Sequence, residues 1–103
     1  MLLSAPEART RLNEQVTVKM CVKAAKNCQR CSLMFLDSEA DHHDPKNFAV
    51  AVTEAGKGKF REAQIDDPAG HFKSKTVRVT GKVIVKDEQP QIEVDDPGQV
   101  EVV

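Results

Sequence analysis

Four basic side chains gather in a stretch of the chain that contains no acidic residue. Lys19, Lys23, Lys26 and Arg30 all fall within residues 15–36. Clustered lysine and arginine side chains contact phosphate groups, so this stretch is a candidate binding site for a nucleic-acid backbone. The same side chains would form an ordinary solvated face in a protein that binds no polyanion.

Acidic residues dominate the other end of the chain. Residues 87–103 contain no basic residue, and the whole chain has a net charge of -1. No global field therefore attracts nucleic acid or an anionic membrane, and binding must rest on the local basic stretch. The acidic side chains of this segment are Asp87, Glu88, Glu93, Asp95, Asp96 and Glu101.

Two cysteines and two histidines form a second chemical candidate. Cys28 and Cys31 are spaced as C-x-x-C, and His42 and His43 follow in a separate polar stretch. Two thiolates with one or two imidazoles can hold Zn²⁺ in a tetrahedral site. The thiols would form a local disulfide if the protein were exported, but they lack the βαβ surroundings of thioredoxin-like enzymes. A polar loop with no cofactor is the simpler expectation.

Catalytic motifs are absent from the sequence. It contains no nucleophile elbow, phosphate-binding loop or zinc-protease motif. The paired aspartates at 66–67 and 95–96 each precede a proline, and such clusters are typical of turns. We therefore expect a protein that is not an enzyme.

Strands, rather than helices, must position these candidates. Alternating apolar and polar residues predict five strands, each with one solvated face. Gly81 indicates a bend or bulge in the fourth strand, and the turn residues 95–98 interrupt the fifth. The predicted strands lie near residues 16–22, 31–37, 48–52, 77–85 and 92–102.

Two helical segments accompany the strands. Ser4 and Glu7 form a capping-box pattern with Pro6 in the first turn, which predicts a short helix over residues 5–12. Residues 54–64 have a weaker helical pattern, which places a helical connector between the third and fourth strands. The predicted fold class is therefore all-β, a five-stranded Greek-key barrel with a short N-terminal helix. Residues 1–13 form an N-terminal extension and residues 14–103 the barrel domain.

The second half of the chain also carries a family resemblance. Residues 71–83 read HFKSKTVRVTGKV, residues 89–94 read QPQIEV and residues 96–102 read DPGQVEV. These segments resemble the last two strands of bacterial OB-fold domains of the tRNA-anticodon-binding-like kind, many of which have no assigned function. Ser74 stands where that family usually has glycine. The resemblance extends over about residues 14–103, because residues 16–18, 35–38 and 47–50 fit the same domains.

The resemblance implies an OB-type barrel that binds its ligand on the face of strands two and three and with the loops that join strands one–two and four–five. Lys19 and Lys23 are expected on the outward face of the first strand, and Lys26 and Arg30 in the loop that follows. The favoured function is a non-enzymatic binding module for single-stranded nucleic acid. All four phenylalanines are expected in the core or the connector, so no ring is expected to stack on bases.

Two alternatives remain open at this point. One is a structural or protein-interaction domain of a larger protein, exported or not. The other is a zinc-binding OB domain that uses Cys28, Cys31, His42 and His43. The first residues lack a signal-peptide pattern and no apolar run is long enough to span a bilayer. Both the cytoplasm and export with a removed signal stay open, as does the oligomeric state.

Overall fold

The structure is a computed structural model that describes residues 2–28, 33–41, 44–65, 67–86 and 88–103. It is mostly β, with a few short helices. None of the helices in these ranges is long and apolar enough to cross a membrane. The elements are β1 (Leu2–Ser4), α1 (Ala5–Ala8), β2 (Gln15–Cys21), β3 (Ala24–Cys28), β4 (Leu33–Asp37), β5 (Ala49–Val52), α2 (Glu54–Glu62), α3 (Pro68–Phe72), β6 (Thr76–Lys86), β7 (Gln89–Val94), the 3-10 turn η1 (Pro97–Gln99) and β8 (Val100–Val102).

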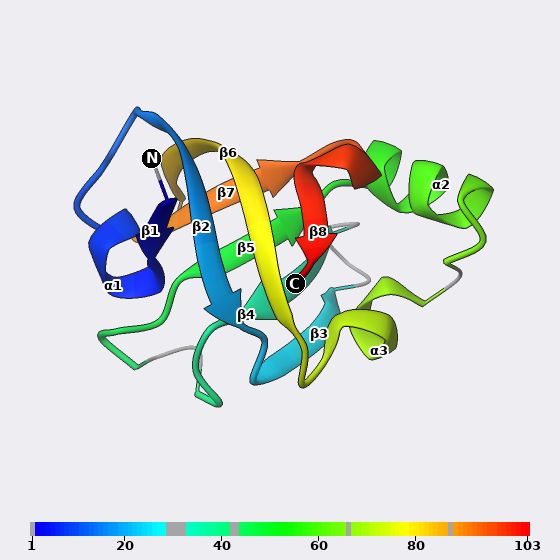
Figure 1. Ribbon diagram of the computed structural model, residues 1–103, viewed down its shortest axis with the longest axis horizontal. Coiled ribbons are helices and arrows are strands. Elements are labelled where there is room, and N and C mark those ends of the chain that lie inside the picture. Colours follow the sequence, from blue (N-terminus) through cyan, green and yellow to red (C-terminus); the bar gives the residue numbers. More distant parts are fainter. Residues whose placement is uncertain (1, 29–32, 42–43, 66, 87) are drawn as a thin grey trace.

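The strands form two layers that pack against each other (Figure 1). The front sheet contains β1, β2, β8 and the first part of β6. The rear sheet contains β3, β4, β5, β7 and the last part of β6. β6 is therefore shared, with Thr76–Lys82 beside β2 and Val83–Lys86 beside β7. The long fourth strand predicted from the sequence is the element that joins the two layers.

The strand pairings do not by themselves close the five-stranded barrel that the sequence predicts. The hydrogen-bonded order is β1-β2-β6-β7-β5-β4-β3, with β8 on β6. β2 and β3 are consecutive in the chain but belong to different sheets. The N–H of Val22 donates to the carbonyl of Lys75, and the N–H of Lys23 donates to that of Asp37. The chain thus passes from the front sheet to the rear sheet at these two residues.

The core between the two layers is built mainly from valine. Its inward side chains come from alternate positions of every long strand, as the period of two requires. Leu3, Ala5 and Ala8 belong to the same core, so the first residues pack onto the sheets. Burying each large aliphatic side chain contributes about 1.5–3 kcal/mol. The largest fully buried side chains are Phe48, Phe60, Met34, Leu36, Ile92, Val18, Val22, Val50, Val52, Val77, Val79 and Val83.

The N-terminal capping box is present as predicted. The N–H of Glu7 donates to Ser4 Oγ at 3.3 Å, and the N–H of Ser4 donates to Glu7 Oε1 at 3.1 Å. That donation from the Ser4 backbone lowers the pKa of Glu7. The predicted helix 5–12 is too long, because α1 ends at Ala8. Arg9 is the residue that caps the end of this helix, and its guanidinium donates to the backbone carbonyl of Asn47.

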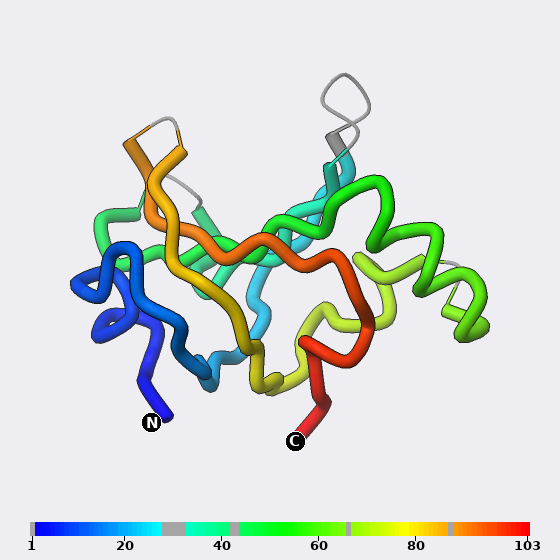
Figure 2. The backbone as a smooth tube through the Cα atoms, turned by 90° about the horizontal axis from the view of Figure 1, so that it is seen from above, coloured from blue at the N-terminus to red at the C-terminus, as the bar shows by residue number. Residues whose placement is uncertain are grey.

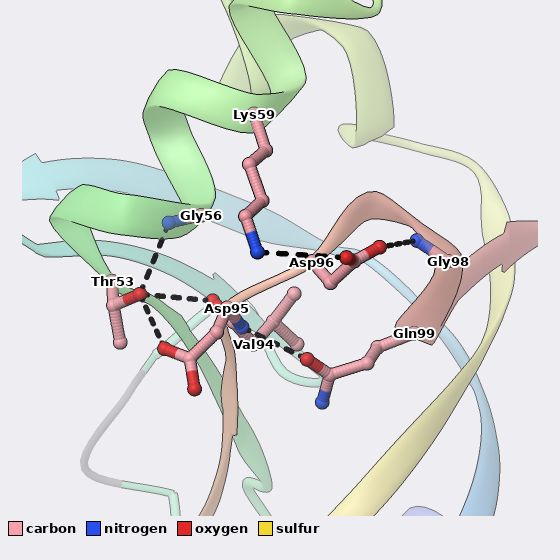
Figure 3. A network of polar contacts seen from close by, with 8 residues as sticks. All are labelled: Thr53, Gly56, Lys59, Val94, Asp95, Asp96, Gly98 and Gln99. Atoms are coloured by element: carbon pink, nitrogen blue, oxygen red, sulfur yellow. Dashed lines mark hydrogen bonds and ion pairs between the residues drawn. The ribbon is translucent and has the colours of Figure 1, made fainter.

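The start of α2 is fixed to the turn between β7 and β8 (Figure 3). Thr53 caps the helix by accepting from the N–H of Gly56 at 3.1 Å, and its hydroxyl lies 2.6 Å from Asp95 Oδ1. A side chain on Gly56 would meet the carbonyl of Val94 at 2.5 Å, so only glycine allows this close approach. Lys59 adds an ion pair of 3.6 Å to Asp96. The predicted interruption at 95–98 is therefore the point where the connector docks.

Candidate nucleic-acid interface

The outer face of the rear sheet carries one row of mixed chemistry, whose two outer members are exposed, whose ring is partly exposed and whose alanine is buried. Met34 and Leu36 face the core, so the alternation of the strand turns Phe35 to the outside. The register places Lys26 of β3 opposite Phe35 of β4. Phe35 in turn faces Ala51 of β5, and Ala51 faces Glu93 of β7. A cation, an aromatic ring, a small residue and a carboxylate thus cross the sheet side by side.

Phe35 is a correction to the sequence prediction, which placed all four phenylalanine rings in the core or connector. Phe48, Phe60 and Phe72 are buried, with exposed fractions of 0%, 1% and 2%. Phe35 is partly exposed. Its ring is therefore available to solvent on the face where the resemblance implied a ligand.

Lys26 is also placed differently from the prediction. It was expected in a loop, whereas it lies within β3 and its side chain is exposed. The polar residues around it form strand because β3 pairs with β4 along five positions, from Ala24 opposite Asp37 to Cys28 opposite Leu33. No ion pair to Lys26 is found in the described part of the chain.

The other predicted cations do not join Lys26 in one stripe. Lys19 lies on β2 in the front sheet, directly opposite Arg78. Lys23 is exposed in the link between β2 and β3 and forms an ion pair of 3.5 Å with Glu39. Arg30 lies outside the described residues. The structure thus separates Lys19 from Lys26, and the binding role of all four remains a prediction.

Two pairs of strand ends rise on either side of β5 (Figure 2). On one side are the ends of β3 and β4, and on the other those of β6 and β7. Lys86, the last residue of β6, is exposed there and lies opposite Gln89. Sequence reasoning missed Lys86 because it treated this loop as the acidic segment that begins at residue 87. The alternation of β6 runs directly into Lys86 and was the signal that could have found it.

A cluster of buried polar groups lies next to this face. Asn47 Nδ2 donates to Asp37 Oδ1 at 3.1 Å, and Asn47 Oδ1 accepts from the N–H of Glu39 at 3.0 Å. Asp37 and Gln91 both flank Ala49 in the register of β4, β5 and β7. Gln91 is only 4% exposed, and within the described ranges its Nε2 has no hydrogen-bond partner. An unsatisfied buried donor costs about 1–3 kcal/mol.

The predicted metal ligands cannot be assembled from the described residues. Cys28 ends β3, opposite Leu33, while Cys31, His42 and His43 lie outside the described ranges. Within those ranges no three His, Cys, Asp or Glu side chains are grouped so that they could hold a metal ion. The zinc hypothesis therefore stays a prediction.

Comparison with known proteins finds similarity in structure alone. No family model matches the chain, and no curated protein matches it. Aspartyl-tRNA synthetase from Entamoeba histolytica superposes with a TM-score of 0.64 at 17% identity, over 100% of this chain and 21% of that one.

Two other synthetases are similar to this chain in structure, also at low sequence identity. A Leishmania major Friedlin protein assigned as an aspartyl-tRNA synthetase has a TM-score of 0.64 at 12% identity, over 100% of this chain and 20% of that one. Asparaginyl-tRNA synthetase from Entamoeba histolytica has a TM-score of 0.62 at 12% identity, over 100% of this chain and 23% of that one. The chain thus spans about a fifth of the length of these enzymes. It has an OB-like fold, shared with one segment of aspartyl- and asparaginyl-tRNA synthetases.

Proposed function

We propose that this chain is a non-enzymatic OB module that binds single-stranded nucleic acid across the outer face of the rear sheet. The observation that carries the proposal is the partly exposed ring of Phe35, placed between Lys26 and Ala51. We also propose that the two sheets act as a single five-stranded OB barrel, with β2 and β3 as one bent strand. Their separation by only Val22 and Lys23 supports that description.

The chemistry of the row suits an unstacked base. Aromatic rings stack on bases of any sequence, and each contact contributes about 1–3 kcal/mol. Ala51, the neighbour of Phe35 in β5, is fully buried, so the Phe35 ring is the apolar group of this row that a base can reach. Lys26 and Lys86 stand at opposite sides of the sheet and would contact the phosphates that flank a stacked base.

The carboxylate of Glu93 sets a limit on this binding. It lies beyond Ala51 in the same row and is exposed. It would repel a phosphate but can accept a hydrogen bond from a base amino group. We therefore place the backbone near the two lysines and the bases over Phe35.

The structural neighbours support the ligand class but not a reaction. They are proteins named for transfer RNA, and this chain corresponds to about a fifth of each. Synthetase activity is named for the whole enzymes, of which this chain covers only a fifth. Binding, rather than catalysis, is the function that we carry over.

The test exploits the absence of Trp and Tyr from the chain. Phe35→Trp introduces a single indole, whose fluorescence should be quenched when an oligothymidine of about twelve nucleotides stacks on it. Phe35→Leu keeps an apolar side chain but loses the ring, and should weaken binding by about 1–3 kcal/mol, measured by fluorescence anisotropy with a labelled oligonucleotide.

Phe72→Leu is the matched control, because that ring is buried away from the face. A Phe72→Leu protein that still folds, as judged by circular dichroism, should bind like the parent. Equal affinity of the parent and the Phe35→Leu protein, or no binding at low salt, would contradict the proposal.

A further inference from the structure

The front sheet (Figure 1) carries three exposed basic side chains on its outer face, Lys19, Arg78 and Lys82. This outer face lies on the opposite side of the molecule from Phe35, because the core separates the two sheets. Its register has three rungs, Lys19 opposite Arg78, Thr17 opposite Thr80 and Gln15 opposite Lys82. We call this surface the front face; it consists of Gln15, Thr17, Lys19, Arg78, Thr80 and Lys82.

Two like charges meet directly on the front face. Lys19 and Arg78 are cross-strand partners in an antiparallel pair, and both are exposed. Like charges in that arrangement destabilise a sheet. Glu101 of β8 offsets only part of the repulsion, through one exposed ion pair of 3.3 Å to Arg78. In the described part of the chain, Lys19 and Lys82 form no ion pair.

The remaining groups of the front face are those that contact a sugar–phosphate backbone. The hydroxyls of Thr17 and Thr80 lie 2.9 Å apart, between the two basic rungs. Hydroxyl and amide side chains contact phosphate oxygens together with lysine and arginine. No aromatic residue belongs to the front face, so it has no platform on which bases could stack.

We propose that the front face is a second contact surface for nucleic acid, which binds the phosphate backbone whatever its bases. This inference rests on the proposed function for the class of ligand, but it uses none of the residues of the Phe35 row. An acidic protein is the competing occupant. Protein interfaces are built around apolar and aromatic cores. The outer side of the front sheet offers only the scattered exposed side chains of Leu2 and Cys21 in that class, so charge complementarity favours the phosphate backbone.

The probe that isolates this surface is an abasic oligodeoxynucleotide of about twelve sugar–phosphate units, which offers phosphates and no bases. We expect it to bind the parent chain at low salt. The double variant Lys19→Gln/Lys82→Gln should weaken that binding and lower the slope of log K against log salt by about 1.4, at about 0.7 per lost phosphate contact. Glu101→Gln should strengthen binding, because it removes the only acidic partner of Arg78 among the described residues.

The matched control is Lys57→Gln/Lys73→Gln, which removes two positive charges from the connector between β5 and β6. It should leave the salt slope nearly unchanged. Lys19→Gln also relieves a like-charge pair, so the melting temperature of the double variant should not fall, and loss of fold cannot explain weaker binding. No binding of the abasic probe, or equal losses in both double variants, would overturn the proposal. Binding of polyglutamate in place of the abasic probe would assign the face to an acidic protein instead.

The two proposals fail in different ways. Phe35→Leu should leave binding of the abasic probe unchanged while it weakens binding of oligothymidine. If oligothymidine bound no better than the abasic probe and Phe35→Leu had no effect, the stacking function would be wrong and the front face would stand. If Phe35→Leu weakened binding of oligothymidine and Lys19→Gln/Lys82→Gln changed binding of neither probe, the front-face proposal would be wrong and the stacking function would stand.

Discussion

Gly81 allows β6 and β7 to pack closely because glycine has no side chain. It lies on β6 opposite Val16 of β2, where the shared strand leaves the front sheet for the rear sheet. A Cβ atom at this position would lie 2.5 Å from Ile92 Cγ2 and 3.3 Å from Gln99 Nε2. The space that glycine leaves is thus occupied by the Ile92 side chain of β7 and by the side-chain amide of Gln99, which donates to the carbonyls of Thr80 on β6 and Glu93 on β7.

Gly81→Ala should therefore destabilise the fold by about 1–3 kcal/mol, the usual cost of forcing extra carbon into a packed site. Gly58→Ala is the control, because apart from its chain neighbours and its own helix backbone no atom lies within 4 Å of a Cβ at that position. It should stabilise the protein by about 0.5–1 kcal/mol through reduced chain entropy. Urea unfolding followed by circular dichroism measures both. A Gly81→Ala protein as stable as the parent would show that Ile92 can move aside.

Phe35 marks the limit of sequence reasoning at the level of the residue. The run Leu33–Leu36 is apolar at every position, so its periodicity cannot tell the inner face from the outer one. The pairing with β3 and β5 settles the choice and puts Met34 and Leu36 inside. The candidate site depended on that choice, which local sequence could not make.

Among the elements, α2 depends on its cap more than on its own sequence. Residues 54–62 contain two glycines, which disfavour a helix by about 1 kcal/mol each. Thr53 offsets this cost by capping the first turn and bonding to the turn after β7. The weak helical pattern forms a helix because the docked turn holds its first residues.

Thr53→Ala should lower the free energy of unfolding by about 1 kcal/mol, a typical loss for a threonine N-cap. Thr53→Ser keeps the hydroxyl that accepts from Gly56 and should lose much less. Thermal or urea unfolding by circular dichroism compares the three proteins. Equal stability of the parent and Thr53→Ala would mean that the network of Figure 3 contributes little to holding α2.

The order of the elements was predictable, and their pairing was not. Alternating apolar residues in β2, β6 and β7 predicted three strands near their observed places, and the turn chemistry of 95–98 predicted the break before β8. β3 was missed because Lys26 and Asn27 look like a turn, and only the pairing with β4 makes them strand. β1 has three residues, too few for any periodicity, and forms because it lies parallel to β2.

Over the whole molecule, a net charge of -1 conceals an uneven surface. Lys19, Arg78 and Lys82 lie on one sheet face, while Glu93, Asp95 and Asp96 lie at the far end of β7. Composition averages these regions and so predicts weak attraction to polyanions. The two sheets hold the basic and acidic side chains apart. The front face therefore could not be predicted from composition and follows only from the pairing of β2 with β6.

Because β6 pairs with strands of both sheets, we expect its hydrogen bonds to be among the last to break when the protein unfolds. Val77–Val79 pair with β2 on one side and with β8 on the other. The later part of the same strand, Val83–Lys86, pairs with β7. Fraying of β1 or β8 leaves β6 paired with β2, so the amide protons of Val77 and Val79, which face β2, should exchange with deuterium only when the whole chain unfolds. Native-state exchange followed by NMR should give Val77 and Val79 opening free energies equal to the global value. Leu3 in β1 should exchange sooner. Faster exchange at Val79 than at Leu3 would show that the hydrogen bonds of β6 are not the last to break.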